Sequence, residues 1–291
     1  MLPGVYSQGL VFDGASTAQI SVVATGATVV GIDGVTVDNG ANVKIRGLAV
    51  MGLNVAVLCG DSIEPHTHLE LDAVEISAGS SSTNLVTLSN CSMSANTVAL
   101  DLNASTGHAI GVSSDSVFHA DRLRIHGDTP SQIGAVGSRW DVRITNSLLE
   151  NVTIVLIPFD TMVPASVFAL GYNTVLLASG NTLDCSNENF LTVVYDNNVI
   201  VGQNLANVVS GTSCTIQNNV LYPQMSPPPA NITADPLLVS PATGDLHLKP
   251  TSPAIDAAAS TTRFPGVQSD YDGAARPHGP KPDIGAYEWR P

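Results

Sequence analysis

The middle of the chain gathers side chains that could bind an anion or move a proton. Four of the eight arginines and two histidines lie between positions 119 and 143: His119, Arg122, Arg124, His126, Arg139 and Arg143. A guanidinium group pairs with a carboxylate or sulfate through two parallel hydrogen bonds, and a histidine or arginine can take a proton from an acidic carbon. We therefore predict an anion-binding site at Arg122, Arg124, Arg139 and Arg143, with His119, Arg122, Arg124, His126 and Arg143 as candidate catalytic groups.

A second interpretation of the same stretch stays open. Acidic residues alternate with these cations, among them Asp121, Asp128 and Asp141. Ion pairs within the protein would then use the arginines, and exposed pairs of this kind contribute only about 0.2–1 kcal/mol each. The sequence alone does not decide between a ligand site and a solvated network of ion pairs.

Other residues that could do chemistry form weaker patterns. His66 and His68 have the H-x-H spacing of some metal sites but lack a third ligand nearby. Several aspartates near the C-terminus offer the oxygen donors that Ca²⁺ prefers, although short polar side chains in Gly/Pro-rich segments commonly cap turns instead. These aspartates are Asp256, Asp270, Asp272 and Asp283.

An internal repeat indicates the elements that must position these residues. A seven-residue template recurs along the chain, with apolar residues at positions 1, 3 and 7 and Asn, Asp or Gly at position 5. We expect positions 1, 3, 5 and 7 to point inward. The template starts at Val43, Val86, Val142, Val193 and Cys214, with weaker copies at Leu69, Val117 and Ala169. The mean step from one copy to the next is about 24 residues, within the range of known repeat architectures. Period-two alternation within such a unit is typical of a β-solenoid, whose inward residues stack about 4.8 Å apart.

The repeat also predicts how the chain is organised. Residues 1–42 are expected to form opening coils, residues 43–222 the repeat coils, and residues 223–291 a Pro/Gly-rich cap and flank packed on the helix. The run Pro227-Pro228-Pro229 cannot donate to a strand ladder. The longest step between copies, from Val86 to Val117, indicates an insertion over 103–116. Since that insertion adjoins the cationic stretch, we expect an anionic ligand to bind beside it.

The composition excludes several classes of protein. The chain is 44% hydrophobic and 12% charged, and its formal net charge is −14. A chain this acidic lacks the electrostatic footprint of a nucleic-acid-binding protein. The longest apolar run, residues 152–159, is far shorter than the roughly 18–20 residues of a membrane-spanning helix. No signal peptide is visible at the start, and we expect a monomer.

The repeats resemble a known family. The copies of the repeat that contain Asn197-Asn198 and Asn218-Asn219 are similar to the PbH1 repeats of pectate-lyase-like proteins, which form a right-handed parallel β-helix. The C-terminal run from Gly244 to Glu288 resembles bacterial extracellular β-helix proteins of the choice-of-anchor Q type. The resemblance implies an all-β, right-handed parallel β-helix that is secreted or displayed on a bacterial cell surface. It also implies an upstream segment that is missing from this chain.

The resemblance further suggests a function. Pectate and alginate lyases of this fold use a Lys or Arg base and acidic residues that hold Ca²⁺ against a sugar carboxylate. Lys44 and Arg46 are predicted to stack on Glu70 and Asp72, so these two carboxylates are weak candidates for a Ca²⁺ site. A surface ladder of ion pairs is the alternative.

Two functions therefore remain in competition. The first is binding of an acidic extracellular polysaccharide, with its cleavage by β-elimination as an open extension. The second is a non-catalytic structural or adhesive module of a cell surface, which the lack of an unambiguous catalytic set favours.

Four cysteines complete the candidate residues, and none has the C-x-x-C spacing of a metal site. Cys185 and Cys214 are separated by somewhat more than one coil, and so are Cys59 and Cys91. We predict a disulfide within each of these pairs, with free buried thiols as the alternative.

Overall fold

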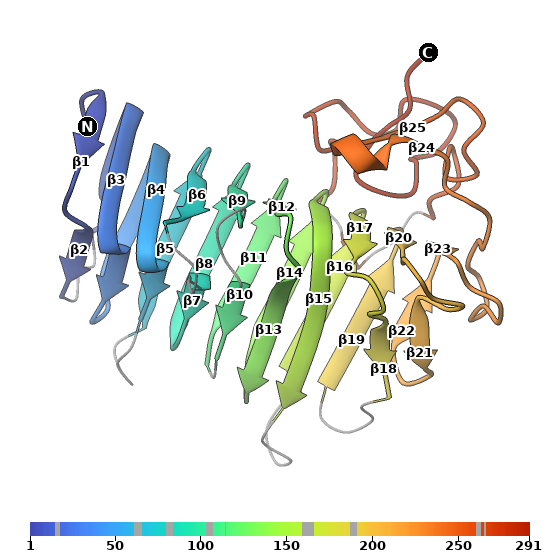
Figure 1. Cartoon of the computed structure of the whole chain (residues 1–291), viewed down its shortest axis with the longest axis horizontal. Helices are drawn as coiled ribbons and strands as arrows, with labels where there is room; N and C mark the ends of the chain where they lie inside the picture. Colours follow the sequence, from blue (N-terminus) through green and yellow to red (C-terminus); the bar gives the residue numbers. More distant parts are fainter. Residues whose placement is uncertain are drawn as a thin grey trace.

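The computed structural model shows a parallel β-helix, as the repeat predicts (Figure 1). It describes residues 1–14, 18–60, 66–79, 84–102, 107–113, 115–158, 166–186, 191–259, 263–264 and 266–291. Each coil contributes to three faces, and the strands of a face pair in parallel with those of the preceding and following coils. Two long strands, β3 (Ile20–Asp38) and β4 (Asn42–Cys59), run through all three faces of their coils.

Face 1 carries the first strand of each coil. It contains the starts of β3 and β4, followed by β5 (Thr67–Asp72), β8 (Cys91–Asn96), β11 (Val117–Asp121), β14 (Asp141–Thr145), β16 (Ser166–Gly171), β19 (Leu191–Asp196) and β22 (Thr215–Gln217).

Face 2 follows after one corner. It contains β1 (Gly4–Tyr6), the middles of β3 and β4, β6 (Glu75–Ala78), β9 (Ala99–Asp101), β12 (Arg124–His126), the start of β15 (Leu148–Pro158), β17 (Thr174–Leu177), β20 (Val199–Val201) and β23 (Val220–Tyr222).

Face 3 closes the coil. It contains β2 (Leu10–Asp13), the ends of β3 and β4, β7 (Asn84–Leu88), β10 (His108–Val112), β13 (Ser131–Gly137) and the end of β15. In the later coils β18 (Leu183–Cys185) pairs with β21 (Val209–Gly211). The inward residues of the three faces form one continuous apolar core along the axis.

The coils are more regular than the sequence pattern indicates. The spacing between paired residues along face 1 is nearly constant from β4 to β19. The copy assigned to Val86 lies in β7, on face 3, whereas Val117 lies on face 1. The long step between them therefore compares two different faces. The prediction of an insertion over 103–116 is therefore wrong. Ser94 and His119 are direct partners on adjacent strands, so the coil between them has the ordinary length.

A stack of left-handed residues forms the corner between faces 1 and 2. Its members have φ between 47° and 68°: Gly47, Ala73, Thr97, Arg122, Asn146, Tyr172, Asn197 and Asn218. Asparagine tolerates this conformation better than most residues, which explains its recurrence at the position that the pattern singles out. The left-handed residue also interrupts the alternation of inward and outward side chains. Leu48 and Val50 point into the core, and Ala49 does not, contrary to the sequence template.

A buried asparagine ladder lies one position after this corner. The Oδ1 atom of Asn198 accepts hydrogen bonds from the backbone N and the Nδ2 of Asn173, at 2.9 and 3.0 Å. Asn219 and Asn231 repeat the arrangement in the coils that follow. Each amide thus satisfies a backbone N–H of the preceding coil that would otherwise be buried without a partner.

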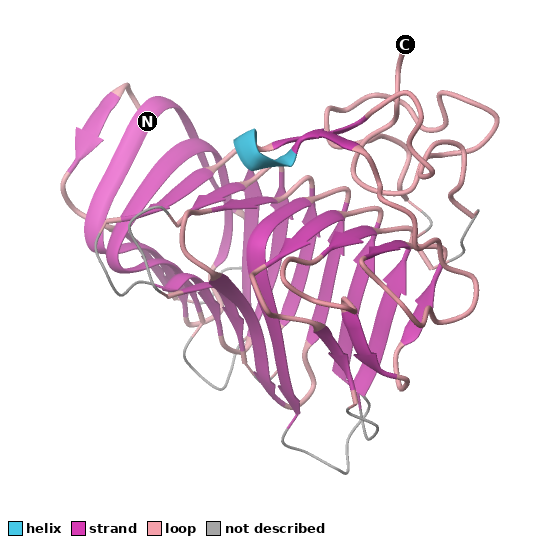
Figure 2. Cartoon of the chain, turned by 45° about the vertical axis from the view of Figure 1, so that its right-hand side comes forward, coloured by secondary structure: helices cyan, strands magenta, loops and turns pink. Residues whose placement is uncertain are grey.

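The chain after Pro229 first extends the helix and then turns back along it. Ile232 still bridges to Val220 in parallel. The C-terminal segment, meaning the described residues from 233 to 291, contains one antiparallel pair, β24 (Leu238–Ser240) and β25 (Asp245–Leu248), joined by the 3-10 turn Pro241–Thr243. Figures 1 and 2 show this segment beside the later coils. None of the described residues forms a helix long and apolar enough to cross a membrane.

Apolar residues on the outside of face 2 hold the segment in place. Leu148, Val199 and Val220 point outward and pack against Leu246, Ile284 and Tyr287 in a second, smaller core. The sequence template assigns the first three side chains to the interior of the helix. The left-handed corner turns them to the outside, where the C-terminal segment covers them.

Candidate functional site

A groove runs along the outside of face 1, across the strands. It consists of two adjoining cavities of about 540 and 420 Å³ that share Glu70, Ser94 and His119. The larger cavity is bounded on one side by the C-terminal segment, through Arg263, Phe264 and residues 266–269. The smaller one extends toward the first coils, to Gln19 and Asn42.

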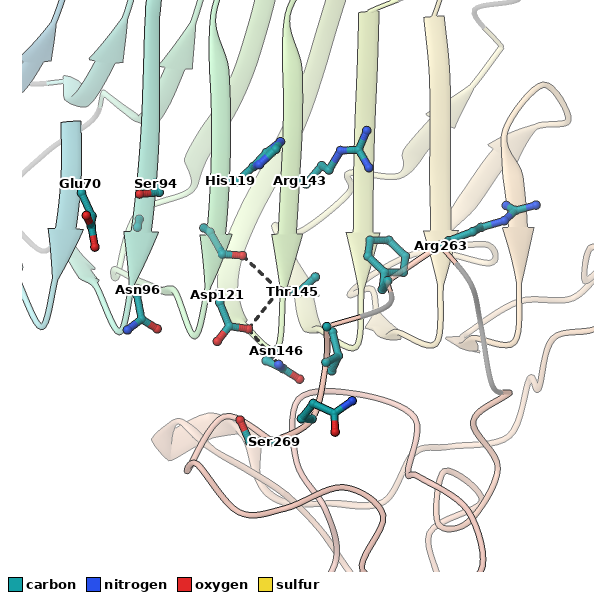
Figure 3. Close-up of a pocket in the computed structure, with 16 residues that line it drawn as sticks. Glu70, Ser94, Asn96, His119, Asp121, Arg143, Thr145, Asn146, Arg263 and Ser269 are labelled. Atoms are coloured by element: carbon teal, nitrogen blue, oxygen red, sulfur yellow. Dashed lines mark hydrogen bonds between the residues drawn. The ribbon is translucent and has the colours of Figure 1, made fainter. Parts of the chain in front are cut away.

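The parallel register sets the residues of the groove in a row. Lys44, Glu70, Ser94, His119 and Arg143 are successive Cα partners on β4, β5, β8, β11 and β14. Their side chains all point away from the core, and neighbouring strands lie about 4.8 Å apart. Figure 3 shows Glu70, Ser94, His119 and Arg143 side by side on consecutive strands, with Arg263 beyond them.

Asp141 joins the two candidate groups, His119 and Arg143, at the end of this row. Its Oδ1 lies 3.5 Å from Nε2 of His119, and it accepts a hydrogen bond of 2.9 Å from Nε of Arg143. Partial burial opposes ionisation of this carboxyl, but the bonds from His119 and Arg143 outweigh it and hold the Asp141 pKa below its ordinary value. The same carboxylate raises the pKa of Arg143, which stays cationic. His119 and Arg143 remain about half exposed, at 49% and 44%.

A second row lines the corner side of the groove. Asp121 accepts hydrogen bonds from Oγ1 of Thr145 at 3.0 Å and from Nδ2 of Asn146 at 2.9 Å, as Figure 3 shows. Arg122 pairs with Asp121 and donates to Asn96 at 2.9 Å. The carboxylate of Asp121 is therefore already bonded to neighbouring side chains. Hydrogen bonds hold this second row in place, and it forms a polar wall of the groove.

The six candidate residues of the central stretch do not form one cluster. His119 and Arg143 share face 1, but Arg122 and Arg139 occupy left-handed positions at two different corners. Arg124 and His126 are on face 2, where both contact the buried carboxylate of Glu150 at 3.2 and 3.3 Å. The structure does not bring the four arginines of the predicted anion site together, because each corner redirects the chain to a new face.

Arg122, Arg124 and Arg139 have structural partners instead. Arg139 donates to Asp115 at 2.6 Å, away from the groove. A Cβ on Gly244 would lie 3.0 Å from an Nη of Arg124, and one on Gly273 would lie 3.6 Å from an Nη of Arg122. These two arginines therefore border the C-terminal segment.

The carboxylates considered for Ca²⁺ binding likewise form ion pairs within the protein. Glu70 pairs with Lys44 at 2.5 Å and Asp72 with Arg46 at 3.2 Å, in the stacked order that the sequence predicts. His68 is exposed and lines the smaller cavity, and His66 is also exposed. Within the described ranges, no three His, Cys, Asp or Glu residues are grouped so that they could hold a metal ion.

The aspartates near the C-terminus cap turns or form ion pairs. Asp283 accepts from the backbone N of Asp256 at 2.7 Å, and Asp270 accepts from the backbone N of Ala274, also at 2.7 Å. Asp272 contacts His247 at 3.1 Å. These contacts match the turn-capping alternative.

Both predicted cysteine pairs are bonded. Cys59 and Cys91 have Cα atoms 5.8 Å apart, and those of Cys185 and Cys214 are 5.2 Å apart. Cys59 pairs in register with Leu88, and Cys185 with Gly211. Each cysteine is bonded to the residue three positions after that partner, which is why both separations exceed one coil.

Sequence reasoning missed several residues of the groove. Ser94 lies one coil length after Glu70, so the mean period of the repeat, counted from Glu70, would have identified it. Arg263, Phe264 and the backbone around Ser269 have no such signal, because their place in the groove depends on how the C-terminal segment packs.

The fold is similar to that of a solved enzyme. The crystal structure of pectate lyase Pel9A superimposes on 99% of this chain and 87% of its own, with a TM-score of 0.56 and 14% sequence identity. At this identity the likeness establishes the parallel β-helix and nothing finer. No family model and no curated protein sequence matches the chain. These comparisons support neither a bacterial source nor the choice-of-anchor Q type.

Proposed function

We propose that the groove on face 1 binds a chain of an acidic extracellular polysaccharide. The observation that carries this proposal is the in-register row of Glu70, Ser94, His119 and Arg143 along an open groove. A polymer of repeating hydroxylated units is the ligand that can contact a repeated row of polar side chains in succession. The fold shared with a pectate lyase is consistent with such a ligand.

Charge favours an acidic polymer at one end of the row. Arg143 and Arg263 both line the larger cavity, and Arg143 is about half exposed. A guanidinium group can bind the carboxylate of a uronate through charge-assisted hydrogen bonds. Because the protein as a whole carries a net charge of −14, and Glu70 and Asp121 line the same cavity, binding must depend on direct contacts to Arg143.

The contact between His119 and Asp141 favours a second candidate, cleavage of the bound chain by β-elimination. Nε2 of His119 faces Asp141, so Nδ1 is proposed to accept the proton from C5 of a 4-linked uronate. The electron pair of that C–H bond forms the C4–C5 double bond, the C4–O bond breaks, and the leaving oxygen takes a proton from solvent. Arg143 would stabilise the negative charge that develops on the substrate carboxylate.

The two disulfides support a location outside the cytoplasm. Disulfides persist in oxidising compartments and are rare where thiols are kept reduced. An extracellular polysaccharide would be accessible to the protein in that setting.

A binding experiment with matched variants tests the proposal. Affinity would be measured by calorimetry for polygalacturonate, alginate and hyaluronate, with dextran as the neutral control. Arg143→Ala should weaken binding to the acidic polymer by more than tenfold, since a hydrogen bond to a charged group contributes about 1.5–3 kcal/mol. Arg139→Ala is the control, because that arginine also pairs with an aspartate but lies outside the groove. Equal losses in both variants, or no binding to any acidic polymer, would overturn it.

A separate assay tests the reaction. The unsaturated uronate product absorbs in the ultraviolet, and His119→Gln should lower its rate of formation by about 10²–10⁴ if His119 is the base. Binding without any product, for wild type and with all three acidic polymers, would leave a non-catalytic binding module.

A further inference from the structure

The outer surface of face 1 changes abruptly after β14. His119 and Arg143 are about half exposed, whereas the next outward residue of the same row, Ala169, is only 4% exposed. Gly171 beside it is also buried. Among the described residues that line the groove, those from the helix end with Asn146, and none belongs to β16 or a later strand.

The aromatic ring of Phe264 covers β16 at Gly171. A Cβ on Gly171 would lie 2.6–2.7 Å from three ring atoms of Phe264, so the ring packs directly on the backbone of β16. Phe264 is itself 8% exposed. Only glycine at position 171 permits this close approach, and the ring occupies the space where a chain in the groove would continue.

Three hydrogen bonds hold the neighbouring part of the segment at the corner. Ala259 donates its backbone N–H to Oδ1 of Asn197 at 3.0 Å, and its carbonyl accepts from Nδ2 of Asn197 at 3.0 Å and from the hydroxyl of Tyr172 at 3.3 Å. The backbone that leads to the obstruction is thus attached to two successive coils.

No described residue obstructs the opposite end of the groove. All described residues that line the smaller cavity come from the helix, between Gln19 and His119, and none of them comes from the C-terminal segment. Among the described residues, the groove therefore has one end without an obstruction, near the first coils, and one closed end, where Arg143 lines the wall.

We infer that the groove receives the end of a polysaccharide chain, with an anionic terminal sugar at Arg143, and excludes binding along an unbroken chain. This inference rests on the proposed function. An obstruction across one end of a groove admits a terminus but stops a continuous polymer, and Arg143 gives the closed end the charge that an acidic terminal residue requires (Figure 3).

Binding capacity measured against chain length tests this inference. The probe is polygalacturonate separated into fractions of different length and compared at equal mass concentration. If only ends bind, halving the chain length doubles the number of sites per gram. A capacity that does not depend on length would overturn the inference and leave the proposed function intact. No binding to any fraction would instead refute the proposed function.

Opening the closed end provides a second measurement. Phe264→Ala should raise the capacity of long polygalacturonate severalfold, because internal stretches then fit. Tyr6→Ala, at an aromatic residue on face 2 that lines neither cavity, should leave it unchanged. Thermal unfolding checks that both variants fold. An unchanged capacity in a folded Phe264→Ala protein contradicts the inference, and the length series on wild type stands whether or not that variant folds.

Discussion

Arg276 and Glu288 form a buried ion pair within the C-terminal segment. Nη1 of Arg276 donates to Oε1 of Glu288 at 2.7 Å, and the two side chains are 1% and 0% exposed. The guanidinium also donates to the carbonyls of Asp283 and Gly285 and lies 5.0 Å from the ring centre of Tyr172. Burial lowers the pKa of Arg276, and the carboxylate of Glu288 opposes that shift. The pair therefore connects the segment to the helix beside the groove.

Removing one partner of this pair should loosen the segment. In Glu288→Gln the cation of Arg276 stays buried without its counter-charge, which costs about 3–5 kcal/mol. Urea unfolding measures the loss, and limited proteolysis should cut within 233–291 first. Arg290→Ala, an exposed cation two residues away, is the control and should change stability by less than about 0.5 kcal/mol. A loss in Glu288→Gln no larger than in the control would contradict the role assigned to the pair.

The asparagine ladder makes a second prediction. In Asn198→Ala the backbone N–H of Asn173 loses the acceptor that it contacts at 2.9 Å in the interior. A buried donor left without a partner costs about 1–3 kcal/mol. The free energy of unfolding should fall by at least that amount, whereas Asn181→Ala, at a partly exposed turn, should have little effect. Equal effects of the two substitutions would show that the ladder does not stabilise the helix.

The two disulfides should contribute similarly. They close loops of 32 and 29 residues, for which the chain-entropy relation gives about 3.5–4 kcal/mol each. Replacing Cys59 and Cys91 together by Ser, or Cys185 and Cys214 together, should lower the free energy of unfolding by nearly equal amounts. Calorimetry of the two double variants makes the comparison. Very different losses would mean that contacts around one bond, and not loop closure, dominate its effect.

The sequence predicts the parallel β-helix well because its apolar pattern repeats with the period of the coil. Lys44 stacks on Glu70 and Arg46 on Asp72 as predicted, since alternation holds within a single strand. The prediction fails where the chain passes a corner. One left-handed residue, such as Arg122, turns the next residues to another face, so that Arg124 is separated from His119 although the two are close in sequence.

The groove wall depends on contacts that no local pattern encodes. Phe264 meets Gly171 because the C-terminal segment covers outward apolar residues of face 2, including Leu148 and Val199. Those residues look like core residues in the sequence, and the segment itself has no period. Its docking follows from the surface that the folded helix presents, which is why the closed end could not be predicted.

His247 makes the stability of the C-terminal segment depend on pH. Partial burial lowers its pKa, but hydrogen bonds to Asp245 at 2.7 Å and Asp272 at 3.1 Å outweigh burial and raise the pKa above the ordinary value. A raised folded-state pKa adds stability that is complete below the unfolded value, about 6.5, and is lost as pH rises through the folded value. Since His247 is 47% exposed, the contribution should stay below about 1 kcal/mol.

The difference in unfolding free energy between wild type and His247→Gln measures this contribution across pH. Wild type should have its full advantage just below a pH of about 6.5, and the advantage should fade in more alkaline solution. It should also decline in strong acid, because the bond to His247 lowers the pKa of Asp245, and protonation of that carboxyl removes the pair. An advantage that grows as pH rises would reverse the assigned sign.

Asp141 should oppose binding and assist the reaction. Its carboxylate pairs with Arg143 and lies close to His119, so it competes with an acidic ligand for the guanidinium and repels the ligand's charge. Asp141→Asn removes a charge worth about 1 kcal/mol at about 4 Å in water, and affinity for polygalacturonate should rise about fivefold. The same change leaves His119 without the carboxylate that orients it, so formation of unsaturated product should slow by at least tenfold. Calorimetry and the ultraviolet assay separate the two effects. A variant that binds more weakly would show that Asp141 supports the ligand site directly, and one that keeps the full rate would remove His119 from the proposed reaction.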